Sequence, residues 1–175
     1  MIRSGRMICW TAVWLAAACP VAIAAGPQDS TTWRWVGSGV QIYDCVESDN
    51  KRAWKLVGPD ALLTDLAGHV RGHHGIGPTW QASDGSLVRG SVIETIAPPS
   101  PNAVPWLVLS AREHTGIGIM DHVALVLRLN TEGGLPPVEG CGATGAARQQ
   151  VRIPYRAIYL FVSEASALRP PLPGG

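Results

Sequence analysis

The sequence predicts an all-β protein, a single domain folded as an antiparallel β-sandwich or barrel-like sheet, closed by one disulfide and preceded by a signal peptide. Seven or eight short segments alternate between apolar and polar residues and are separated by Gly and Pro turns. Beyond residue 25, no segment has the pattern of a long amphipathic helix. Short strands with frequent turns are typical of sandwiches and barrels.

Residues 1–25 have the order of a secretory signal peptide. Arg3 and Arg6 precede the apolar run 7–18, and Ala22-Ile23-Ala24 provides a small-x-small cleavage site. The apolar run is too short, and Pro20 follows it too closely, for a membrane span. We therefore expect a periplasmic or extracellular protein whose mature chain begins at residue 25 or 26.

Cys19 offers an alternative end to the signal peptide. In Leu15-Ala16-Ala17-Ala18-Cys19 the cysteine could be lipidated, as in lipoprotein signals. Those signals usually carry leucine three positions before the cysteine, where this chain has Ala16, and an ordinary cleavage site lies just downstream. We expect ordinary cleavage, with a lipid anchor at Cys19 as the alternative.

Size and charge narrow the choice of partners. Removal of residues 1–25 leaves about 150 residues, enough for one domain with a well-filled core. Loss of Arg3 and Arg6 changes the count to 12 Lys and Arg against 13 Asp and Glu, a formal net charge of −1. Such a chain has no general attraction for phosphate backbones or anionic lipid. We expect no nucleic acid partner.

Two cysteines, Cys45 and Cys141, remain in the mature chain. A pair in an exported protein most often forms a disulfide because the compartment is oxidising. The closed loop would hold roughly 95 residues, and chain entropy suggests about 4–5 kcal/mol of stabilisation. Two reactive thiols or half a metal site remain the alternatives.

The first half of the domain, predicted over 33–164 after a flexible lead at 26–32, reads as strands. Residues 39–46 alternate, with Gln41, Tyr43 and Cys45 on one side. Residues 52–57 are extended, Gly58-Pro59-Asp60 should interrupt them, and 61–64 form a short strand.

The second half contains the strongest turn signal. Asp84-Gly85 between the extended runs 78–82 and 87–96 predicts a tight hairpin. Further strands are expected at 106–111 and 123–129. A last strand, 151–163, places Tyr155, Tyr159 and Phe161 at even spacing, and a disordered Pro/Gly tail follows at 165–175.

Several motifs, in order, resemble the secreted bacterial and fungal family catalogued as domain of unknown function 3455. They are Gly39-Val40-Gln41-Ile42-Tyr43-x-Cys45, His74-x-x-Gly77-Pro78-Thr79-Trp80, Asp84-Gly85-Ser86, Pro105-Trp106-Leu107, Arg128-Leu129-Asn130-Thr131-x-Gly133-Gly134, Gly140-Cys141 and Val151-x-x-Pro154-Tyr155.

This resemblance spans roughly 36–162 and implies an exported single domain without a defined chemistry. Some family members carry a dehydrogenase label, but this chain has no Gly-rich strand-to-helix turn that could hold a dinucleotide, and we expect no cofactor. His73 and Gly75 stand where many members have a basic and an aromatic residue, so a site lined by that aromatic would be altered here.

The histidine-rich segment 69–74 does not predict a metal site. Flanking glycines exclude a helix, and on a strand His69 and His73 would share a face about 13 Å apart, with His74 opposite. Such side chains cannot jointly bind one ion at about 2 Å. We expect exposed histidines, with His74 packed against the turn that leads to Trp80.

Trp80 and Asp84, at the predicted hairpin, and Trp106, at the start of the strand predicted at 106–111, are candidates for ligand binding. Trp80 and Trp106 could stack on a sugar, or they could belong to the β-core. Asp84 could be a site carboxylate, or only the residue that its turn requires.

Arg128 and His74 complete the candidate set. Arg128, between apolar neighbours, should pair with a carboxylate such as Glu94 or Asp121, with anion binding as the alternative. No Gly-x-Ser-x-Gly elbow supports a serine nucleophile.

The sequence favours a non-catalytic binding module for an extracellular ligand, a glycan or a small molecule. The candidate site comprises His74, Trp80, Asp84, Trp106 and Arg128. One alternative is a hydrolase-like enzyme in which His74 acts as general base with a carboxylate. Another is a structural or stress-related envelope protein.

Overall fold

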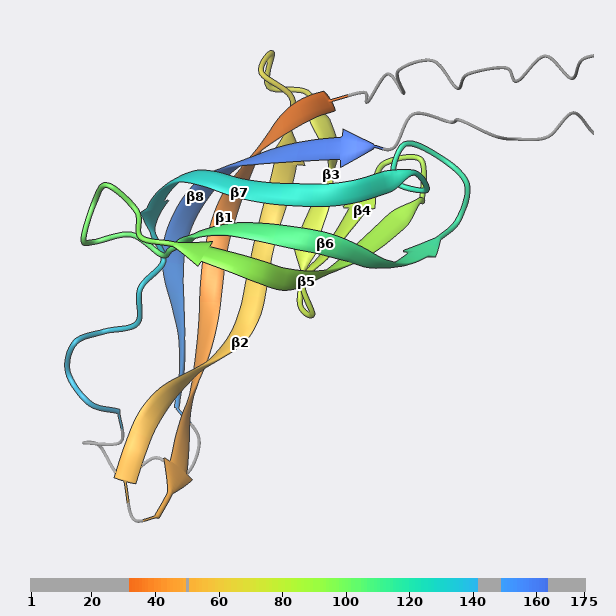
Figure 1. Ribbon diagram of the computed structural model, residues 1–175. Coiled ribbons are helices and arrows are strands. Elements are labelled where there is room, and N and C mark those ends of the chain that lie inside the picture. The colour runs from red at the N-terminus through yellow and green to blue at the C-terminus, as the bar shows by residue number, and fades with distance from the viewer. Residues whose placement is uncertain (1–31, 50, 142–148, 164–175) are drawn as a thin grey trace, which may run out of the picture.

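Antiparallel strands close into a barrel, which confirms the all-β prediction and selects the barrel form (Figure 1). The computed structural model describes residues 32–49, 51–141 and 149–163. Each strand pairs with the next in sequence, and β8 pairs with β1 to close the sheet. The strands are β1 (Thr32–Ser48), β2 (Lys51–Thr64), β3 (Val70–Gly75), β4 (Thr79–Ala82), β5 (Leu87–Ile96), β6 (Trp106–Thr115), β7 (Val123–Gly133) and β8 (Gln150–Ser163).

Several sequence predictions lie outside the described residues. They are the signal peptide at 1–25, the alternative lipid site Cys19, the lead up to residue 31 and the tail at 165–175. Thr32, the last residue of the predicted lead, already belongs to β1. Across the described ranges, no helix has the length and hydropathy needed to cross a membrane.

The long β1–β2 hairpin projects beyond the barrel, toward the lower left of Figure 1. The predicted interruption at Gly58-Pro59-Asp60 is wrong, because β2 runs unbroken through these residues. A β-bulge accommodates them: the register shifts opposite Ile42 and Tyr43, where Gly58 has a φ of 151°. Bulges tolerate both a glycine with unusual backbone angles and a proline that cannot donate a ladder hydrogen bond.

The barrel core follows from strict alternation along β8. Tyr155, Ala157, Tyr159 and Phe161 are all buried, as the even spacing of the aromatic residues predicts. Phe161 stacks on Trp33 at a ring-centroid distance of 5.5 Å. In Figure 1, β5, β6 and β7 run across the direction of β1 and β2, so the core lies between two crossing layers of one continuous sheet.

The predicted hairpin at Asp84-Gly85 is confirmed. It joins β4 to β5, and Gly85 adopts a φ of 89°, which favours glycine. Asp84 accepts a hydrogen bond from the backbone N–H of Ser86 at 2.9 Å, the usual local bond of an aspartate turn. The local turn therefore explains the hydrogen bond that Oδ1 of Asp84 accepts, and it assigns no partner to Oδ2.

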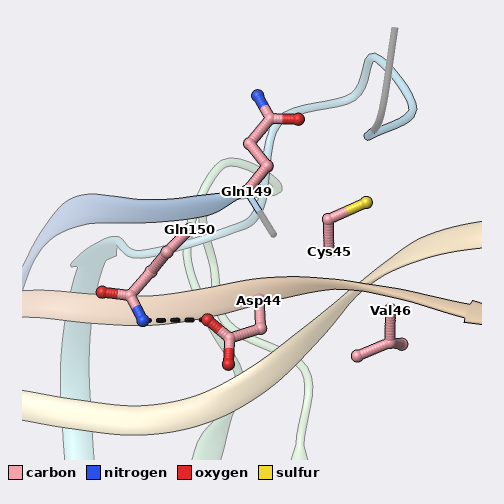
Figure 2. A pocket seen from close by; sticks show the side chains of 5 residues that line it. All are labelled: Asp44, Cys45, Val46, Gln149 and Gln150. Carbon is pink, nitrogen blue, oxygen red and sulfur yellow. Dashed lines mark hydrogen bonds between the residues drawn. The ribbon is translucent and has the colours of Figure 1, made fainter. Parts of the chain in front are cut away.

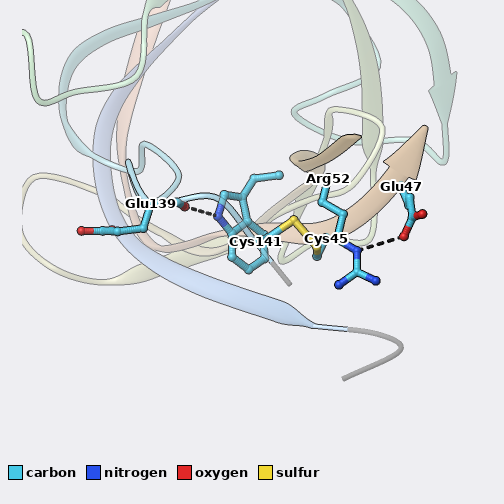
Figure 3. The surroundings of a disulfide bond; sticks show 6 residues. Cys45, Glu47, Arg52, Glu139 and Cys141 are labelled. Carbon is cyan, nitrogen blue, oxygen red and sulfur yellow. Dashed lines mark hydrogen bonds and ion pairs between the residues drawn. A yellow bond between two sulfur atoms is a disulfide. The ribbon is translucent and has the colours of Figure 1, made fainter. Parts of the chain in front are cut away.

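The predicted disulfide between Cys45 and Cys141 is confirmed. Its Cα atoms lie 5.6 Å apart, within the usual range, and it connects β1 to the segment after β7 (Figure 3). Beside it, the indole of Trp54 donates to the carbonyl of Glu139 at 3.2 Å. Disulfides of this kind are typical of oxidising compartments outside the cytoplasm.

Candidate functional site

Three aromatic rings meet inside the barrel. His74 of β3 stacks on Trp80 of β4 at a centroid distance of 4.7 Å, and Tyr159 of β8 meets both rings edge-on. The Nδ1–H of His74 donates to the carbonyl of Thr79 at 2.8 Å, which confirms the predicted packing against this turn. His74 is 2% exposed and Trp80 1% exposed, so neither ring forms part of an external stacking surface.

Burial keeps His74 neutral. Removal from water lowers its pKa from 6.5 to about 3, and the positive charge of Arg128 acts in the same direction. Among the described residues no carboxylate contacts this ring, so the pair of His74 with a carboxylate that the hydrolase alternative invoked is not formed.

Arg128 of β7 points into the barrel from a position paired with Leu107. Its Nε and Nη2 donate to the carbonyl of Pro105 at 3.1 and 2.8 Å. The predicted ion pair with Glu94 or Asp121 is therefore wrong. Asp121 instead lies 3.2 Å from the ring of His122, and Glu94 is exposed.

The tyrosines around Arg128 carry no countercharge. Tyr155 and Tyr159 share a hydrogen bond between their hydroxyl groups. Burial raises the pKa of both, and that of Tyr43, although the charge of Arg128 lowers all three. The phenols are therefore neutral near pH 7. No carboxylate of the described chain is among the groups that shift these pKa values.

Gln41 adds a buried polar group that the sequence analysis did not select. Its side chain is 1% exposed, and neither its amide nitrogen nor its oxygen has a hydrogen-bond partner in the described structure. The alternation of β1 did place Gln41 on the same side as Tyr43, so the available signal was a polar residue on a core-facing side. We define the interior polar cluster by its five residues, Gln41, His74, Arg128, Tyr155 and Tyr159.

A separate hollow of about 400 Å³ lies near the start of β1, and we call it the end groove. Trp35, one of its lining residues, precedes Gln41 by six positions, about 20 Å along an extended strand. The lining residues are Trp35, Arg71, Ala82, Ser83, Asp84 and Ile119.

The charged side chains of the end groove are held in place. Asp84 accepts from the Ser86 hydroxyl and, through Oδ2, from the Ile119 N–H at 2.9 Å. These bonds lower its pKa and keep it ionised. Arg71 donates through Nε and Nη2 to Asp65 at 2.9 and 2.7 Å.

Trp106 belongs to neither site. It is the first residue of β6 and is partly buried, while its neighbour Leu107 packs against the core, so alternation directs Trp106 to the other side of the sheet. Of the five predicted site residues, His74, Trp80 and Arg128 therefore converge inside the barrel. Asp84 lines the end groove, and Trp106 lies apart.

A further hollow of about 350 Å³ lies beside the disulfide (Figure 2). It is lined by Asp44, Cys45, Val46, Gln149 and Gln150, and the amide of Gln150 donates to Asp44 at 2.8 Å. This lining contains no cation and no aromatic ring, so it has fewer means of holding a ligand than the end groove.

The remaining histidines of the segment 69–74 lie on the outside. His69 contacts Asp65 at 3.2 Å and His73 contacts Asp60 at 2.9 Å. The described residues contain no group of three or more His, Cys, Asp or Glu that could hold a metal ion.

His74 should make stability depend on pH. Because its pKa is about 3 in the folded state and 6.5 ordinarily, the unfolded chain binds a proton that the folded chain does not. Stability should therefore fall, by about 1.4 kcal/mol per pH unit, as the pH drops below about 6.

The measurement is urea unfolding of the wild type and His74→Phe between about pH 4.5 and 6.5, above the range in which carboxylates with lowered pKa values titrate. The variant should show the flatter profile. Parallel profiles would contradict a neutral buried His74.

Comparison with known proteins places the chain by family alone. No curated protein and no solved structure matches it. A family model described as a protein of unknown function, DUF3455, matches residues 26–163, and the chain therefore belongs to the DUF3455 family.

Proposed function

We propose that the domain is an exported, non-catalytic binding module that holds a small extracellular ligand in the end groove. The single observation behind this proposal is a hollow of about 400 Å³ that combines the small exposed part of a largely buried indole, Trp35, with two held charges of opposite sign. Pockets for small molecules have about this volume, with apolar walls and a few placed polar groups.

The lining favours a ligand with one apolar face and several hydroxyl groups, such as a single sugar residue of a glycan. Ile119 provides most of the apolar surface and Trp35 a small exposed part of its ring, while Arg71 supplies the N–H groups that Asp65 does not occupy and Asp84 supplies acceptor oxygens. Arg71 is already paired with Asp65, and Asp84 already accepts from Ser86 and Ile119, so the groove favours a neutral ligand that adds hydrogen bonds over an ion.

Filling the groove should weaken binding. Ile119, 44% exposed, lines the hollow, whereas Ile117 is 92% exposed in the same loop and does not line it. We expect Ile119→Trp to weaken binding at least about tenfold, since poorer packing against the ligand and steric exclusion each cost over 1 kcal/mol. Ile117→Trp adds the same side chain and should bind like the wild type.

Glycan arrays should first find a ligand for the wild type, and titration calorimetry should then compare the two variants. Equal affinities of both tryptophan variants would remove the end groove as the binding site. Absence of any wild-type ligand among glycans would refute the assigned ligand class.

A further inference from the structure

We propose that the interior polar cluster is a second binding site, separate from the end groove, and that it takes a small free carboxylate with Arg128 as the charged partner. This inference does not depend on the proposed glycan function. It rests on the charge, hydrogen bonding and enclosure of the cluster.

The cluster carries a positive charge without a countercharge from the described chain. Arg128 donates to a backbone carbonyl through Nε and Nη2 and hydrogen-bonds the hydroxyl of Tyr159, and its charge acts on Tyr43, His74, Tyr155 and Tyr159. All four of these groups are neutral near pH 7. A partly buried guanidinium in such surroundings is stabilised when an anion joins it.

Hydrogen-bond counting also favours an anion. The Tyr155 and Tyr159 hydroxyls share one bond, which occupies only one of their two hydrogens. The amide nitrogen and oxygen of Gln41 and the indole N–H of Trp80 have no partner in the described structure, so three N–H hydrogens stand against one unpaired acceptor atom. Donors therefore exceed the acceptors, and buried donors without partners are costly.

The enclosure limits the ligand to a small molecule. Gly134 lies over Gln41: a Cβ built on this glycine would stand 3.1 Å from the Gln41 side chain and 2.9 Å from that of Tyr155. The Tyr43 hydroxyl donates to the Gly134 carbonyl at 2.6 Å and holds this cover in place. Entry requires the cover to shift, so we assign the site to a ligand the size of acetate rather than to a sugar acid.

A carboxylate suits the cluster better than a halide. Its two oxygens lie in one plane and can accept from a guanidinium edge and a neighbouring amide or phenol together. Chloride offers a single spherical acceptor and would satisfy fewer of the directional donors around Arg128.

The test uses trifluoroacetate as a probe, observed by fluorine NMR. We expect saturable binding to the wild type, at least about tenfold weaker binding to Arg128→Met, and a smaller loss in Gln41→Leu. Arg156→Gln is the matched control because Arg156 pairs with Glu132 at the surface, 3.6 Å away. It should bind like the wild type.

Thermal unfolding provides a second measurement that also reports folding. Acetate at constant ionic strength should raise the wild-type Tm by about 5–10 °C when it is 100-fold above Kd, and leave that of Arg128→Met unchanged. Without acetate, a cooperative unfolding transition of the variant shows that it is folded, so that a lost acetate response reports lost binding.

Three outcomes would overturn the proposal. The first is no saturable wild-type binding, and the second is equal binding by Arg128→Met. The third is displacement of the probe by chloride as effective as that by acetate, which would assign the site to a halide. Ile119→Trp should keep its acetate response, so failure at the end groove and failure here are distinguishable.

Discussion

Replacing Cys45 and Cys141 together by alanine is expected to lower the free energy of unfolding by about 4–5 kcal/mol. The two residues are 96 positions apart, so the disulfide restricts a large part of the unfolded chain. It also attaches the segment after β7 to the projecting β1–β2 hairpin, where Trp54 bonds to Glu139. Without the disulfide, the bonds that remain at this end among the described residues include that of Trp54, the Cys45 N–H to the Gln149 carbonyl, and Gln150 to Asp44.

Urea unfolding of the double variant and the wild type measures this loss. The wild type in excess reductant is the control, and it should unfold at the same urea concentration as the double variant. A difference below about 1 kcal/mol would contradict the entropic account and indicate a compact denatured state.

Trp80→Ala should also cause a loss of about 3–5 kcal/mol. The indole stacks on His74 and meets Tyr159 and Phe161 edge-on, so its removal leaves a cavity at the centre of the barrel. Loss of these ring–ring interactions adds to the transfer free energy of the indole.

Trp106→Ala is the matched control for Trp80→Ala. It deletes the same side chain from a partly buried position outside the aromatic cluster, and we expect a loss of about 1–2 kcal/mol. Urea unfolding checks both values. Equal losses from the two variants would contradict the placement of Trp80 at the centre of the core.

Local patterns were sufficient to predict most strands, and two cysteines in a chain expected to be exported were sufficient to predict the disulfide. Alternation identified the last strand and the inward positions of Tyr155, Tyr159 and Phe161, and Asp84-Gly85 located the hairpin. The sequence failed at Gly58-Pro59-Asp60, because a bulge in a long hairpin and a true strand end use the same residue types.

The sites depend on contacts that alternation does not reveal. The packing of His74 against the neighbouring turn could be predicted because the two are close in sequence. The carbonyl that accepts from Arg128 belongs to Pro105, 23 residues away. Trp35 and Arg71 meet Asp84 only because β1, β3 and the β4–β5 turn reach the same end of the closed sheet. The spacing of residues in the sequence does not show which distant residues come together in the closed sheet.

Because β1 pairs with both β2 and β8, the barrel can close only after β8 has been synthesised. The earliest strand to leave the ribosome must keep one edge unoccupied until the final strand emerges, more than 100 residues later. Until then the nascent chain exposes a long strand edge whose N–H and C=O groups are unpaired and can bind another strand. Shielding of that edge by a chaperone would protect it from pairing with other copies.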